Sequence, residues 1–146
     1  MATAPLEGDG MGKRETGEEV VRRVGREALH FLTVAGFSGP SDVDGGLAYL
    51  GHGLKITVCH HLWIHEVGVS AFVESTAEPL PERHWLQVER LYAECGLGPP
   101  NHLPGTAANA RLTEVRVRAF ASALRDLLPF LLVSDRDALM HRASAR

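Results

Sequence analysis

The sequence predicts an α+β fold: an N-terminal helix, a three-stranded antiparallel sheet, and two to three C-terminal helices packed on one face of that sheet. Three observations predict it. Apolar residues recur at helical spacing near the N-terminus, then alternate with the period of two that is typical of strands, and return to helical spacing in the C-terminal half. Because helices and strands occupy separate parts of the chain, we expect an α+β rather than an alternating α/β arrangement.

Residues 1–15 contain glycine, proline and mixed charge without periodicity, so we expect a flexible tail before a single domain at 16–146. Thr16, which is followed by acidic residues, predicts the start of a helix. Threonine can cap the first turn, and negative charges there interact favourably with the helix dipole. Gly36 is well placed to end this helix. The predicted apolar stripe comprises Val20, Val21, Val24, Ala28, Phe31, Leu32 and Ala35.

Three strands should follow the first helix. Residues 38–42 form a predicted loop, and residues 46–50 a short first strand between glycine-containing turns. In residues 54–74 every second residue is apolar over two runs, as in a sheet with one buried face. This segment is far longer than the usual strand of about five or six residues, so the chain must turn within it. We place the turn between His61 and Glu66.

The C-terminal half predicts helices separated by a long loop. The first helix opens near Pro79 and places Trp85 on its buried face, and residues 97–111 form a loop rich in glycine and proline. A long helix should begin at Thr113, and Pro129 should kink or stop it, because proline cannot donate the next helical hydrogen bond. A short helix is predicted to follow at the C-terminus.

Size and composition limit the classes of protein to which the chain can belong. Its 146 residues are 45% hydrophobic and 23% charged, which is typical of one globular domain. A net charge of −3 gives no basic field for nucleic acid, and no apolar run approaches the roughly 20 residues of a membrane span. The N-terminus resembles no signal peptide, and two cysteines are too few for a disulfide framework. We therefore expect a cytosolic protein without nucleic-acid or membrane partners.

Four potential metal ligands gather around the predicted turn, namely Cys59, His60, His61 and His65. Thiolate and imidazole are ligands that zinc and copper prefer, so the cluster suggests a zinc or other transition-metal site. Strand geometry opposes the simplest version of this site. His60 and His61 point to opposite faces of a strand, and His61 and His65 would lie about 13 Å apart unless the turn folds back. The simpler interpretation is a strand end with ordinary polar residues and no cofactor.

Cys59 could act as a nucleophile only with a neighbouring base and an acid that orients that base. His61 and Glu66 are close in sequence, but same-face neighbours on a strand lie about 7 Å apart, too far for a direct hydrogen bond. The chain contains no phosphate-binding loop and no serine-nucleophile motif. We therefore assign no catalytic residue, and an enzyme with a pocket between sheet and helices is only a third alternative.

Trp63 lies in the predicted turn, where a large aromatic residue either locks the sheet to a helix or anchors a partner. With His65 and Glu66 it forms the candidate partner-binding surface.

The order of elements supplies a resemblance at the level of pattern. A leading helix that ends at Gly36-Phe37 is followed by three strand-like runs, over residues 18–78. This outline resembles that of small bacterial immunity proteins of toxin systems, and of many small bacterial α+β proteins. The resemblance implies a protein that acts by binding another protein, and it assigns no functional residue.

The first functional interpretation is a non-enzymatic cytosolic module that binds another protein, in the manner of an immunity or adaptor protein, through its sheet and hairpin surface. A mildly acidic chain suits a basic partner. The alternative is a small metal- or ligand-binding protein that uses the Cys/His cluster at residues 59–65. Bound metal would separate the two interpretations.

Overall fold

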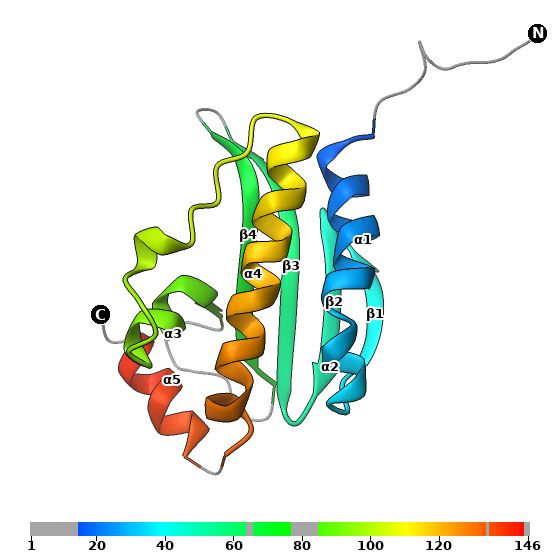
Figure 1. Cartoon of the computed structure of the whole chain (residues 1–146). Coiled ribbons are helices and arrows are strands. Elements are labelled where there is room, and N and C mark those ends of the chain that lie inside the picture. The colour runs from blue at the N-terminus through cyan, green and yellow to red at the C-terminus, as the bar shows by residue number, and fades with distance from the viewer. Residues whose placement is uncertain (1–14, 64–65, 77–84, 134, 145–146) are drawn as a thin grey trace, which may run out of the picture.

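The computed structural model describes residues 15–63, 66–76, 85–133 and 135–144 (Figure 1). The helices are α1 (Gly17–Ala28), α2 (His30–Val34), α3 (Val88–Glu94), α4 (Ala110–Leu131) and α5 (Arg136–Ser144), with a 3-10 turn at Pro100–His102. The strands are β1 (Ser38–Val43), β2 (Gly46–Gly51), β3 (Leu54–Trp63), β4 (Glu66–Ser75) and β5 (Leu86–Gln87).

The sheet has five strands, so the expectation of three strands is wrong, although the α+β class is confirmed. Neighbouring strands are antiparallel and follow chain order from β1 to β5. The predicted loop at 38–42 lies in β1, whose Ser-Gly-Pro-Ser-Asp-Val sequence favours turns and becomes a strand through pairing with β2. β5 has only two residues directly before α3, which is too short for a periodic signal.

The first helix begins where the sequence predicts, at a capping box. The Thr16 hydroxyl accepts a hydrogen bond from the Glu19 amide (3.1 Å), and the Glu19 carboxylate accepts one from the Thr16 amide (2.8 Å). The predicted single helix up to Gly36 is wrong, because Leu29 ends α1 and the five-residue α2 follows it. Gly36 has a φ of 101°, a conformation that glycine adopts without strain as the chain leaves α2.

β3 and β4 form the long hairpin that the alternation predicts. Ile56 pairs with Val73, and both side chains are fully buried. β3 ends at Trp63 and β4 begins at Glu66, so the predicted position of the turn is confirmed. Residues 64–65 themselves lie outside the described residues.

The long C-terminal helix differs from the prediction at both ends. α4 starts at Ala110, three residues before Thr113, because the Asn109 side chain caps its first turn with a 2.9 Å hydrogen bond from a backbone amide. Pro129 lies inside the helix, which ends two residues later. The proline therefore removes one hydrogen bond in the last turn without stopping the helix where it stands.

Other predicted segments fall partly outside the described residues. Of the predicted tail, only Glu15 is described. The helix expected to open near Pro79 begins at Val88, and residues 77–84 are not described. The predicted loop at 97–111 contains the 3-10 turn and the beginning of α4.

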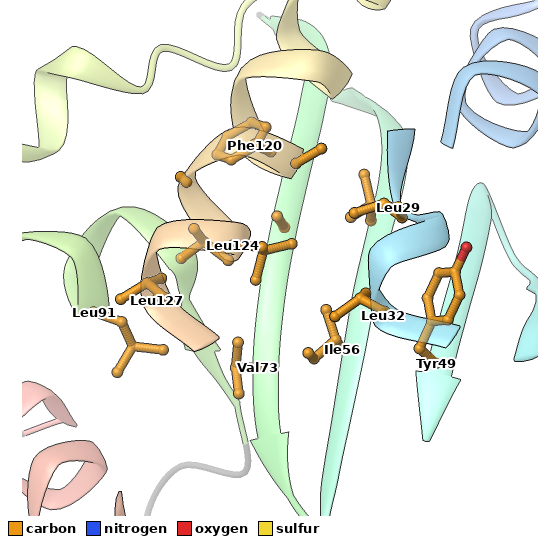
Figure 2. Packing of buried hydrophobic residues seen from close by; sticks show 14 of the residues in the cluster. Leu29, Leu32, Tyr49, Ile56, Val73, Leu91, Phe120, Leu124 and Leu127 are labelled. Atoms are coloured by element: carbon orange, nitrogen blue, oxygen red, sulfur yellow. The ribbon is translucent and has the colours of Figure 1, made fainter. Parts of the chain in front are cut away.

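The core lies between the sheet and the helices on one of its faces. α1 and α4 contact each other and run side by side across the sheet, whereas α3 and α5 contact each other beside one end of α4 (Figure 1). None of the described helices is long and apolar enough to cross a membrane. Figure 2 shows the side chains from α2, α4 and the strands that meet in this cluster, among them Leu32, Tyr49, Ile56, Val73, Phe120, Leu124 and Leu127.

Candidate functional site on the open face of the sheet

The face of the sheet opposite α1 and α4 is here called the open face. From Leu54 to Val58 in β3 and from Val69 to Val73 in β4, every second side chain is buried in the core. The side chains between them therefore point to the opposite side. No helix among the described residues lies over that side (Figure 1). The open face comprises Ala48, Leu50, Lys55, Thr57, Cys59, His61, Glu66, Ser70, Phe72, Glu74 and Gln87, with Trp85 beside β5.

A chain of polar contacts lies on the open face at the β3–β4 turn. His61 Nδ1 and Ser70 Oγ are 2.9 Å apart, and Nε2 of the same ring lies 3.9 Å from a carboxylate oxygen of Glu66. The Thr106 hydroxyl, from the segment before α4, donates to the other carboxylate oxygen over 3.5 Å. These contacts connect the end of the hairpin to the chain that leads into α4.

Sequence reasoning missed Ser70 as the partner of His61. The two residues sit diagonally on paired strands, since Cys59 pairs with Ser70 and His61 with Gly68. The predicted alternation placed Ser70 on the same face as His61, but the contact depends on the register of the hairpin. If the position of the turn had been known to within one residue, the register of the hairpin would have followed, and the pair could have been predicted.

Burial sets the protonation of the two reactive groups on this face. Burial lowers the pKa of His61, and the nearby Glu66 carboxylate opposes this effect. A neutral His61 ring that carries its proton on Nε2 can accept a hydrogen bond from the Ser70 hydroxyl at Nδ1. Burial raises the pKa of Cys59, so its thiol stays protonated at neutral pH and is a poor nucleophile.

The structure separates His60 from two other predicted metal ligands, Cys59 and His61. Cys59 and His61 share the open face, whereas His60 points to the covered face, where its ring lies against Gly17 of α1. His65 lies outside the described residues. In the described part of the chain, no three histidine, cysteine or acidic side chains are grouped so that they could hold a metal ion.

An aromatic pair forms the apolar part of the open face. The rings of Phe72 and Trp85 meet edge to face with centroids 4.7 Å apart. A shallow pocket of about 280 Å³ opens beside them and is also lined by Thr57, Cys59 and Glu74. Trp85 is 42% exposed and precedes β5, so the expectation that it packs in the core on a helix is wrong.

β1 and the part of β4 that does not pair with β5 are protected against the addition of another strand. β1 contains Pro40, which has no amide hydrogen to donate, and its register with β2 is irregular. On the other side, the Val69 amide donates to Gly105 and the Ala107 amide to Val67, both over 2.9 Å. The face of the sheet is therefore a better candidate for docking than its edges.

Of the predicted partner-binding residues, Trp63 and Glu66 lie at the hairpin end of the sheet. Trp63 is the last residue of β3 and pairs with Glu66. The Glu66 side chain is 46% exposed, and its carboxylate contacts His61 and Thr106. The side chain of Trp63 and all of His65 lie outside the described residues.

A larger pocket of about 740 Å³ lies between the first turns of α1 and α4. Small side chains make up most of its wall, and its charged lining groups, Glu15 and Arg111, have opposite signs. The Glu15 carboxylate is already bound by Arg23 through two hydrogen bonds of 2.7 and 2.8 Å. The imidazole of His60 also lines this pocket, but the lining has no excess of either charge that would define a ligand.

Comparisons with protein-family models, with curated proteins and with solved structures each find no match for the chain. The resemblance to immunity proteins therefore stays a prediction from the order of the elements, and the functional argument rests on the open face itself.

Proposed function

We propose that this protein is a cytosolic protein-binding module of the immunity or adaptor type, which docks its partner on the open face and the adjoining end of the β3–β4 hairpin. The observation that supports this proposal is the one-sided covering of the sheet. Helices bury one face, while the other face presents the Phe72–Trp85 pair and Leu50, which is 46% exposed. Exposed apolar surface rimmed by polar residues is typical of interaction sites.

The chemistry of the open face also favours binding over catalysis. An aromatic anchor surrounded by polar side chains is the usual anatomy of a protein interface. The Cys59 thiol is kept protonated by burial, and Nδ1 of His61 is hydrogen-bonded to Ser70. These groups are suited to recognition through hydrogen bonds rather than to nucleophilic attack.

The hairpin end supplies the proposed polar contacts. Trp63, His65 and Glu66 lie in or beside the turn between β3 and β4. With a net charge of −3, the chain suits a partner with a basic surface, which electrostatic attraction would steer toward it.

Site-specific photo-cross-linking in the cells from which the chain comes tests this proposal. A photoreactive amino acid replaces Thr57 at the centre of the open face or, as a control, the exposed Ser122 on α4. We expect a discrete protein adduct from position 57 and none from position 122. Equal adducts from both positions, or none from position 57, would contradict the proposal.

The alternative is a small metal-binding protein, and the shared face of Cys59 and His61 is the observation that favours it. In that case zinc, copper or iron should be present at near-stoichiometric amounts in protein purified without chelator. Elemental analysis of the wild-type chain beside His61→Ala decides between the two functions. Metal that is present in the wild type and lost in the variant would support the metal site, whereas metal-free protein would remove it.

A further inference from the structure

One row of the open face is complementary in charge to the same row read in reverse. Leu50 of β2 pairs with Lys55 of β3, and Lys55 pairs with Glu74 of β4. Val73 pairs with Leu86, so the preceding residue, Trp85, comes to lie beside Glu74. The row therefore runs apolar, cation, anion, apolar across four neighbouring positions of the sheet.

The end members of this row are the large, exposed hydrophobic side chains of the open face. Leu50 is 46% exposed and Trp85 is 42% exposed. The charged members are also available, because the ion pairs among the described residues include neither Lys55 nor Glu74. Two opposite charges side by side, flanked by apolar groups, need a complementary row on whatever docks there.

We propose that a second copy of this chain docks on the open face, about a two-fold axis that runs along the strands midway between β3 and β4. Such an axis exchanges the places of β3 and β4, and those of β2 and β5. Lys55 of one copy then faces Glu74 of the other, and Leu50 faces Trp85. The inference rests on the proposed function in taking the open face as a docking surface. It fills that face with a second copy, so a different protein would dock on the hairpin ends.

The rest of the face is compatible with this arrangement. In the next row Thr57 would face Phe72, and in the row beyond it Cys59 would face Ser70, so no like charges meet. Two sheets related in this way keep their strand directions aligned, as face-to-face sheets commonly do at a separation of about 10 Å. A two-fold interface also uses the same patch twice, which is the commonest form of association between identical chains.

The symmetry has a consequence for the proposed function. Because the axis runs along the strands, both β3–β4 hairpin ends lie at the same end of the dimer. The dimer would therefore present two copies of the hairpin surface side by side, and a partner with two binding segments would gain avidity from it.

Mass measurement by light scattering, with charge reversal, tests the pairing. The wild type should have twice the 15.9 kDa of one chain, and Lys55→Glu and Glu74→Lys should each reduce the mass to that of one chain. The double variant Lys55→Glu/Glu74→Lys should restore the dimer, because each new charge meets its opposite across the axis. A wild type that stays monomeric at every concentration, or a double variant that stays monomeric, would overturn the inference.

Thermal unfolding of the wild type, the two single variants and the double variant tests whether Lys55 and Glu74 interact only within one chain. Lys55 and Glu74 are also neighbours within one chain, so restored melting temperature alone would show only their contact across β3 and β4. A restored melting temperature without a restored dimer mass would therefore count against the inference.

Cross-linking tests the position of the axis. In a Cys59→Ala/Cys95→Ala background, Leu50→Cys/Trp85→Cys places thiols that face each other between copies but lie about 14 Å apart within one copy. A short bismaleimide should therefore join two chains. Leu50→Cys alone should not be joined, because the two copies of residue 50 lie on opposite sides of the axis. Cross-linking of Leu50→Cys alone, or a lack of cross-linking in the double variant, would refute this geometry.

The outcomes separate this inference from the proposed function. A monomeric wild type would remove the dimer but leave the photo-cross-linking from position 57 as the test of partner binding. An adduct from that position that has the mass of two copies of this chain would support the dimer and leave no separate partner on the open face.

Discussion

The ring of His60 occupies the space where a side chain at residue 17 would lie. A Cβ atom placed on Gly17 would come within 2.2 Å of two ring atoms of His60. This contact fixes the histidine against the first turn of α1 on the covered face, away from Cys59 and His61. The alternation of β3 and this close approach together keep His60 apart from Cys59 and His61.

Because of the contact between Gly17 and His60, we expect the effect of Gly17→Ala on stability to change sign when His60 is also replaced. Gly17→Ala should destabilise the wild type, because the ring of His60 must move away from the new methyl group. In a His60→Ala background the same substitution should stabilise the protein by up to about 1 kcal/mol, because alanine favours helix more than glycine. Chemical unfolding of the four proteins measures the cycle, and equal effects in both backgrounds would show that the contact is absent.

The buried imidazole of His61 predicts a dependence of stability on pH. Because burial lowers its folded-state pKa below the unfolded value of about 6.5, the unfolded chain binds the proton more readily. The free energy of unfolding should therefore fall as the pH drops from neutral through that value toward the lower folded-state pKa.

The wild type and His61→Asn are both unfolded with denaturant at a series of pH values. The difference between their free energies of unfolding isolates the contribution of His61 from those of the other histidines. The variant should lose less stability than the wild type over that interval. Identical pH profiles would contradict the assigned burial of His61.

At the scale of elements, the alternation of the β3–β4 hairpin assigns a face to each residue. Ile56 lies in the core with no exposed surface, and Thr57, the next residue, lies on the open face. The sequence predicts this hairpin because a buried face imposes a period of two on the side chains. It does not predict β1, since Ser38, Gly39 and Pro40 favour turns and only the partner strand makes them extended.

The same limit applies to the candidate site. Cys59, His61 and Glu66 could be placed on one face from alternation alone, whereas the contact of His61 with Ser70 needed the register of two strands. Trp85 fits a helical stripe in the sequence, yet it stands beside β5, because the extended pairing with β4 precedes the helix.

Aspartate introduced at one position on each face of β3 tests which face is buried in the core. Ile56→Asp should destabilise the fold by roughly 4 kcal/mol or more, because it buries an unpaired charge in the core. The matched variant Thr57→Asp places its carboxylate on the open face and should still fold and melt cooperatively. Circular dichroism during heating compares them, and loss of folding in both variants would mean that both faces are covered.

At the scale of the whole molecule, all described helices lie on one side of an antiparallel sheet (Figure 1). Pro40 interrupts the edge strand β1, and the segment at residues 105–107 bonds to β4, so the open face is the broad surface of the sheet available to a partner. The proposed function therefore depends on whether that face binds protein.

The most direct test is a titration of the partner identified by cross-linking against three proteins: the wild type, Thr57→Arg on the open face, and the control Ser122→Arg on α4. Thr57→Arg should weaken binding by about tenfold or more, equivalent to about 1.4 kcal/mol, because a bulky charge is placed in the centre of the interface. Ser122→Arg should bind as the wild type does. Equal affinity for all three proteins would show that the partner docks elsewhere and would contradict the assignment of the open face.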